Sequence, residues 1–169
     1  LSNMNLAYVD AAGVVHNLRL TGTTWAHLDV SAANRLDHAA EQIAPLYDEG
    51  QISLIVRFSD GSFTLVAQRN SIWDREDLSY LARAPAATAR FVALAASFDE
   101  IVYGAVDGTL RHLRWSGGPF PGDEPVAGAP APTGPLAGAY DSYGFYAGPA
   151  GVPVTFSFQT TTLVVRSLA

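Results

Sequence analysis

The segment Tyr103-Gly-Ala-Val-Asp-Gly108 indicates the fold class of this chain, because the chain nearly repeats it three more times. The related stretches are Tyr8-Val-Asp-Ala-Ala-Gly13, Phe58-Ser-Asp-Gly61 and Tyr146-Ala-Gly-Pro-Ala-Gly151. Each is followed by an apolar segment, and the four final glycines fall 48, 47 and 43 residues apart. Self-similarity at this interval predicts an array of supersecondary units, each burying an apolar face against its neighbour.

Within each repeat the hydrophobic pattern has the period of strands, and the repeated stretch reads as a hairpin turn. Asp and Gly suit such a turn because they tolerate positive φ. The expected hairpin strands are 5–9 with 14–20, 52–58 with 62–68, 100–106 with 109–115, and 145–147 with 152–158. Pro153 has no backbone N–H to donate, which places it at an edge or at the start of its strand.

Each hairpin has further strands beside it. Segments rich in small residues precede three of the hairpins, at 43–47, 91–96 and 136–140. Outer segments follow all four, at 25–29, 73–78, 120–124 and 163–166, and an aromatic opens the first three: Trp25, Trp73 and Phe120, each twelve residues beyond its turn glycine. Four strands in each unit of 43–48 residues is typical of a propeller blade.

The sequence therefore predicts an all-β fold, a β-propeller of four-stranded antiparallel blades. About four repeats form a single domain, approximately at 1–38, 39–86, 87–132 and 133–169. The first repeat lacks its inner strand, since only four residues precede Asn5. An unpaired edge invites another strand, so we expect a partner, a second copy or sequence outside this chain to complete the ring.

Three segments leave alternatives open. Residues 34–43 and 74–83 are rich in helix formers, so each is an alternative site for two or three helical turns. The Gly- and Pro-rich run 116–138 is interpreted as a connection between blades, with a hinge between half-domains as the alternative.

Composition excludes several classes of function. The net charge is −6 and no basic run is present, which disfavours a nucleic-acid partner. The absence of Lys excludes Schiff-base chemistry, and the absence of Cys excludes thiolate nucleophiles and disulfides. No apolar run approaches the ~20 residues of a membrane helix. The start at Leu1 suggests a processed or excised chain, and an extracellular location is favoured although composition does not decide it.

Catalytic and metal motifs are absent. His16, His27 and His38 are evenly spaced at 11 residues, an interval that fits neither a helix face nor a strand face, so no metal site is expected there. Among the acidic clusters, only Asp99 with Glu100 opens a strand and offers a candidate pair of glycosidase carboxylates. No nucleophile motif is present. We therefore expect a non-enzymatic protein without a cofactor, with a hydrolase fragment as the least supported alternative.

The succession of small-residue strand, Tyr-containing strand, Asp-x-x-Gly turn, His-containing strand and Trp-bearing outer strand resembles the fucose-specific lectins of fungi and bacteria. The resemblance implies a propeller in which an Arg on the second strand and a Glu on the third hold the sugar, and an aromatic of the neighbouring blade stacks on it. Here the Arg positions carry Asn5, Ser53, Glu100 and Tyr143, and the Glu positions carry Asn17, Leu65, His112 and Thr155. No Arg/Glu pair is complete.

The remaining candidates are residues suited to bind a sugar. Trp25, Trp73 and Trp115 have flat faces that can stack on a sugar ring. The hydrogen-bonding candidates are Asn5, Asn17, Glu100, Arg111 and His112. Trp25 and Trp73 recur with the repeat, so packing between sheets is the favoured alternative for both. Trp115 ends a strand before Ser116-Gly-Gly118 and is expected to be more exposed, with ligand and core equally favoured.

The sequence thus predicts a lectin-like propeller with a glycan as its possible ligand. The alternative is an interaction or assembly module without a small ligand, whose ring is completed by a partner chain or as a homo-oligomer.

Overall fold

The computed structural model describes residues 4–48, 51–69, 72–88, 91–93, 100–115, 121–139, 143–159 and 162–168. In these ranges the chain is built from antiparallel strands with only short helical turns. It divides into two compact units, Leu1–Asp77 and Leu78–Ala169. Among the described residues, no helix is long and apolar enough to cross a membrane.

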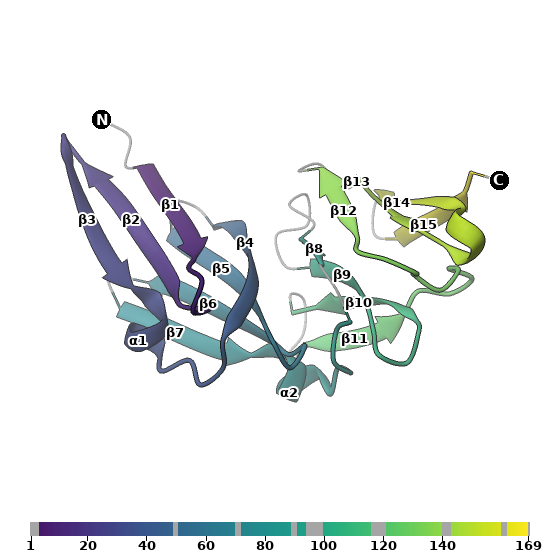
Figure 1. Ribbon diagram of the computed structural model, residues 1–169, viewed down its shortest axis with the longest axis horizontal. Helices are drawn as coiled ribbons and strands as arrows, with labels where there is room; N and C mark the ends of the chain where they lie inside the picture. The colour runs from purple at the N-terminus through teal and green to yellow at the C-terminus, as the bar shows by residue number, and fades with distance from the viewer. Residues whose placement is uncertain are drawn as a thin grey trace. The chain divides into compact units, whose positions relative to one another are not determined.

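The first unit contains two sheets whose strands follow one another in chain order (Figure 1). Sheet 1 has three strands: β1 (Met4–Val9), β2 (Val15–Thr21) and β3 (Thr24–Asp29). Helix α1 (Val30–Asn34) leads to sheet 2, which has four strands: β4 (Ala40–Asp48), β5 (Gln51–Phe58), β6 (Phe63–Arg69) and β7 (Ile72–Asp77). Within the described residues sheet 1 has no strand before β1, as expected for a first repeat without its inner strand.

The second unit begins with α2 (Leu78–Ala82) and contains two four-stranded sheets. Sheet 3 consists of β8 (Val92–Ala93), β9 (Glu100–Gly104), β10 (Leu110–Arg114) and β11 (Gly122–Pro125). Sheet 4 consists of β12 (Ala137–Ala139), β13 (Tyr143–Ala147), β14 (Pro153–Gln159) and β15 (Thr162–Ser167), with the 3₁₀ turn η1 (Pro149–Gly151) between β13 and β14.

The predicted hairpins and outer strands are confirmed except at some ends, such as Val106, which lies in a turn, and Leu78, which begins α2, and Pro153 is the first residue of β14. Parts of three predicted strands, at 94–96, at 120 and at 140, lie outside the described residues, as does Asp99. The helical alternatives hold only in part. Residues 40–43 are strand, and the segment 74–83 changes from strand to helix after Asp77. The boundary between the compact units also falls after Asp77. It does not fall in the run 116–138, the alternative position for a hinge between half-domains.

All four hairpin turns close with the same two backbone hydrogen bonds. In the first turn, the Asp10 N–H donates to the Val14 carbonyl and the Gly13 N–H donates to the Asp10 carbonyl, both at 3.0 Å. The equivalent bonds link Phe58 to Ser62, Ala105 to Thr109 and Gly148 to Val152, with Gly61, Gly108 and Gly151 as the second donors. Each of the four turn glycines has a φ between 75° and 83°, which only glycine adopts readily. The repeat seen in the sequence is therefore a repeat of main-chain geometry.

Each unit has a hydrophobic core between its two sheets. In the first unit, Val15 and Val30 join Leu54, Val56 and Val66 of sheet 2. In the second unit, a separate cluster combines residues of sheet 3 and sheet 4, namely Val92, Val102, Leu110, Leu136, Tyr146, Val154 and Phe156. One face of each sheet thus packs against its neighbour within the unit, which leaves the polar positions on those faces between two sheets.

Candidate functional site

The layer between sheets 1 and 2 holds three of the predicted ligand-binding residues. Asn5 of β1 and Asn17 of β2 lie on one face of sheet 1, since Ala7 is the register partner of Asn17 and strand residues alternate between faces. Ala7 packs against the core shared with sheet 2. Asn17 is only 3% exposed, whereas Asn5 lies in an exposed position near the rim.

Trp73 enters the same layer from the outer strand of sheet 2. It packs, partly buried, against the core cluster that also contains Val15 and Val30. Trp73 therefore packs within this core. Its indole Nε1 and the amide Nδ2 of Asn17 are both buried and have no hydrogen-bond partner among the described residues. A buried donor without an acceptor costs roughly 1–3 kcal/mol, so two such donors in one layer require an explanation.

Sequence reasoning missed one residue beside this pair of asparagines. Arg19 is the register partner of Asn5, so its guanidinium belongs to the same exposed row and the same face. The resemblance implies an Arg where Asn5 stands, and the structure places Arg19 directly across the ladder from that position. The signal was available in the hairpin register, because the turn fixes which residue faces Asn5.

Trp25 lies on the opposite face of sheet 1, away from Asn17. It shares a cross-strand row with Met4 and Leu20 and is 46% exposed. Trp25 is therefore not enclosed between two sheets of the described residues. Trp25 also does not join Trp73 in one site.

Glu100 and His112 form a buried ion-pair contact in sheet 3. The Nε2 atom of His112 lies 3.1 Å from Oε2 of Glu100, and both side chains are at least nine-tenths buried. His112 is opposite Val102, so the pair lies on the face that packs against sheet 4. These two residues occupy the positions that correspond to Asn5 and Asn17, and here they contact each other.

Arg111 is held on the other face of sheet 3. Its Nε donates to Oδ2 of Asp123 at 2.6 Å, and Oδ1 of Asp123 accepts from the Tyr103 hydroxyl at 2.9 Å. Burial and the Asp123 carboxylate raise the pKa of Tyr103. Burial works against the charge of Arg111, but its bond to Asp123 raises the pKa of the guanidinium overall. The structure therefore separates Arg111 from His112 and gives it structural partners. Trp115 follows β10 directly and is partly buried.

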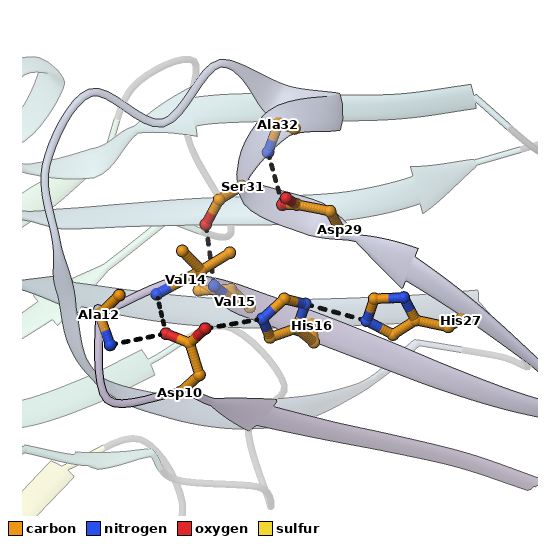
Figure 2. A network of polar contacts seen from close by, with 9 residues as sticks. All are labelled: Asp10, Ala12, Val14, Val15, His16, His27, Asp29, Ser31 and Ala32. Atoms are coloured by element: carbon orange, nitrogen blue, oxygen red, sulfur yellow. Dashed lines mark hydrogen bonds and ion pairs between the residues drawn. The ribbon is translucent and has the colours of Figure 1, made fainter.

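A second polar cluster, which the sequence did not predict, lies on the exposed face of sheet 1 (Figure 2). Asp10 Oδ2 lies 3.2 Å from Nε2 of His16, and Nδ1 of His16 lies 3.0 Å from Nε2 of His27. The ring of Tyr8 stacks on His16 with centroids 4.9 Å apart. This cluster and the Asn17 layer occupy opposite faces of the same sheet.

The comparisons with known proteins bear on the fold. No family model matches the chain, and no curated protein matches it. AofleA from Arthrobotrys oligospora aligns with 98% of the chain at 12% identity and a TM-score of 0.57. A triple arginine-to-alanine mutant of AofleA gives 0.58 at the same identity and coverage. The chain spans 56% of the length of either solved chain.

A fucose lectin from Kordia zhangzhouensis in complex with methyl-fucoside also matches, at 10% identity and a TM-score of 0.44, over 96% of this chain and 97% of that one. At these identities the AofleA structures show a shared fold and nothing more. The chain is thus an all-β protein of antiparallel sheets whose fold is similar to that of AofleA.

Proposed function

We propose that this protein is a non-catalytic, carbohydrate-binding β-propeller whose glycan site lies between sheets 1 and 2. The observation that supports this proposal is the pair of buried donors, Asn17 Nδ2 and Trp73 Nε1, which lack acceptors among the described residues. Sugar hydroxyls are hydrogen-bond acceptors, and the C–H face of a sugar ring stacks on indole. A glycan would therefore meet both the polar and the aromatic requirements of this layer.

The sugar enters this site at the exposed row of sheet 1. Asn5 and Arg19 are register partners in that row, one step from the Ala7–Asn17 row, and they offer an amide and a guanidinium at the rim. Because the donors inside are buried, the ligand must part the rim side chains to reach them. We expect slow binding relative to an open groove, since a rearrangement precedes the final contacts.

The ring itself is completed by sequence or chains beyond the described strands. The chain spans 56% of the AofleA chains whose fold it shares. Sheet 1 ends at the unpaired edge of β1 in the described part of the chain. A closed propeller removes such edges, and this proposal assigns further blades to a partner, a second copy or flanking sequence.

A glycan array followed by calorimetric titration of the best glycan tests the proposal. We expect Asn17→Ala and Arg19→Ala each to weaken binding about tenfold or more, because each removes a hydrogen bond worth roughly 1–3 kcal/mol. Trp25→Ala is the matched control, since it removes an indole from the opposite face of the same sheet. Absence of any bound glycan, or an equal loss in Trp25→Ala, would reject the site.

A second candidate function is assembly with another protein chain, favoured by the apolar face of sheet 1. Met4, Leu6, Tyr8 and Trp25 are 51, 53, 38 and 46% exposed and share that face. An apolar sheet face of this kind beside an open edge is typical of an interaction surface.

Sedimentation of the wild-type chain tests the assembly role. If the chain self-associates, Leu6→Ser should shift it toward the monomer, whereas Tyr80→Ser should not, because Tyr80 is an exposed aromatic of α2, outside sheet 1. A monomeric wild type over the whole concentration range would leave self-assembly without support.

A further inference from the structure

We propose that His16 and His27 form a chelating site for a divalent transition metal, Cu²⁺ or Ni²⁺ in preference to Zn²⁺, with Asp10 as its orienting carboxylate. This site is independent of the proposed glycan site, because its residues lie on the other face of sheet 1. The following geometry carries the proposal.

The two rings meet because a tight turn folds β2 onto β3. His16 is the register partner of Asp29, and His27 is the register partner of Leu18. The histidines are therefore diagonal neighbours on one face, within reach of each other across the ladder. Nε2 of His27 lies 3.0 Å from Nδ1 of His16, and the ring centroids are 5.0 Å apart (Figure 2). The two histidines are 11 residues apart in sequence, and they meet because the β2–β3 hairpin brings their strands side by side.

Asp10 fixes the tautomer of His16 that a metal requires. Its Oδ1 accepts hydrogen bonds from the N–H groups of Ala12 and Val14, each at 2.9 Å, so the carboxylate is held by the turn. Oδ2 of Asp10 accepts the Nε2–H of His16 at 3.2 Å, which leaves the Nδ1 lone pair facing His27. Metal-bound histidines commonly donate their second N–H to a carboxylate in this way.

Tyr8 limits the motion of the His16 ring, one of the two proposed metal ligands. Its ring stacks on the His16 imidazole at an interplanar angle of 29°, which holds the imidazole plane on one side. Asp29 lies in the same cross-strand row as His16, but its Oδ1 accepts from the Ala32 N–H at 2.8 Å at the start of α1. Asp10, Tyr8 and Asp29 are thus the titratable groups around the pair, and Asp10 is the one bonded to it.

The separation of the two nitrogens favours a particular coordination geometry. Metal–imidazole bonds are about 2.0–2.1 Å, so an N···N distance of 3.0 Å corresponds to an angle at the metal of about 94°. That angle fits neighbouring positions of a square-planar or octahedral ion, whereas a tetrahedral Zn²⁺ needs roughly 3.3 Å between the nitrogens. The ion would lie off the N···N line, in the exposed space above the sheet.

Binding replaces the hydrogen bond between the rings without net loss of a proton. In the metal-free pair, His27 donates its Nε2–H to Nδ1 of His16. On binding, His27 loses that proton to solvent and takes one up at Nδ1, so each ring gives a lone pair to the metal. No third histidine or carboxylate among the described residues completes a cluster for a metal ion. Water therefore fills the remaining coordination positions, and the site is a two-ligand chelate.

Titration of the full chain with NiCl₂ or CuCl₂, followed by calorimetry, tests the proposal. We expect one site, with His16→Ala and His27→Ala each weakening binding by about tenfold or more. Asp10→Asn should weaken it by about tenfold or more as well, within the range typical of outer-shell partners. CaCl₂ and MgCl₂ should give no binding heat, because those ions prefer oxygen ligands. The Cu²⁺ electron paramagnetic resonance spectrum should show two coupled nitrogens.

Two matched variants serve as controls. His38→Ala removes an exposed histidine that lies near Asp60 of the second turn, and Asp60→Asn changes a turn carboxylate of that second hairpin. Neither should alter metal affinity. No binding by the wild type, unchanged binding in His27→Ala, or an equal loss in His38→Ala would overturn the proposal. His27 is exposed on the sheet surface, so its alanine variant is expected to fold, which circular dichroism checks.

Discussion

At the scale of single residues, adjacent residues of one strand face opposite sides of its sheet and have different partners. Arg111 and His112 follow each other in β10 but face opposite sides of sheet 3, where Arg111 meets Asp123 and His112 meets Glu100. The sequence prediction placed both in one set of ligand-binding residues. The period of two in a strand already argues against that grouping, because neighbours cannot share a face.

The buried pair gives the first prediction. Glu100→Gln should lower the free energy of unfolding by about 1–3 kcal/mol, because it disrupts the buried contact with Nε2 of His112, and a buried polar group that loses its partner costs about that much. Urea denaturation measures this. His38→Ala is the control, since the His38–Asp60 contact is exposed and should matter by less than about 1 kcal/mol. Equal effects in the two variants would contradict the assigned burial.

Gly144 gives the second prediction, because the ring of Phe156 lies directly across from it. A Cβ at this position would lie 1.9 Å from Cζ of Phe156, which no small adjustment relieves. Gly144→Ala should therefore destabilise the second unit by about 1–3 kcal/mol or more. Gly134→Ala meets nothing within 4 Å and should be nearly neutral. In thermal unfolding, Phe156→Leu should recover part of the loss when combined with Gly144→Ala, and independent effects would show that the ring is not the cause.

At the scale of elements, the turns carry carboxylates that respond to pH. Hydrogen bonds from Val14 lower the pKa of Asp10, and hydrogen bonds from Thr109 lower that of Asp107. For Asp60, burial acts in the opposite direction, but the Ser62 bonds lower its pKa overall. All three pKa values are lower in the folded state than the ordinary aspartate value of 3.8, so the unfolded chain binds more protons near that pH.

The third prediction follows from the lower pKa values of these carboxylates in the folded state. The stabilisation from the turn carboxylates is complete above the unfolded pKa, near 3.8, and is lost as the pH falls through the lower folded values. The variant Asp60→Asn with Asp107→Asn should therefore have a shallower loss of melting temperature between neutral and acidic pH than the wild type. Glu124→Gln, a change at an exposed carboxylate of β11, is the control. Parallel melting curves for all three proteins would contradict the assigned role.

The short helices show a repeat that the sequence prediction did not use. Helix α1 follows Asp29 and ends at Arg35, and α2 follows Asp77 and ends at Arg83; both arginines have φ near 52–53°. These arginines lie 48 residues apart, the same interval that separates Gly13 from Gly61. The pattern Asp-x-Ser-x-x-x-Arg was therefore available, and it explains why residues 40–43 are strand: the helical turn precedes them.

At the scale of the whole molecule, each unit carries its own core, and the fourth prediction rests on this division. Leu54→Ala should cost about 2–5 kcal/mol, because Leu54 is buried in the core between sheets 1 and 2. Native-state hydrogen exchange should show the larger acceleration within Leu1–Asp77 and a smaller one within Leu78–Ala169. Uniform acceleration over both units would mean that the chain unfolds as a single body.

The strands were predictable because their signals are local: alternation with a period of two, and a glycine at each turn. The candidate site was predictable only in part. Asn5, Asn17 and Trp73 could be proposed from their position in the repeat, and the structure brings them into one layer. Arg19 and the His16–His27 contact depend on cross-strand register, which a reading along the chain does not reveal. The exposure of Trp25 depends on what lies beyond sheet 1.

The four turns share one pair of backbone bonds and differ in their side chains. They are therefore interchangeable parts. A chimera in which the Phe58–Ser62 loop replaces Asp10–Val14 would keep the chain reversal while deleting the carboxylate that orients His16. Grafting Asp10–Val14 elsewhere would move that carboxylate to another hairpin. The turn backbone is the same in all four repeats, so each repeat can carry different side chains on it.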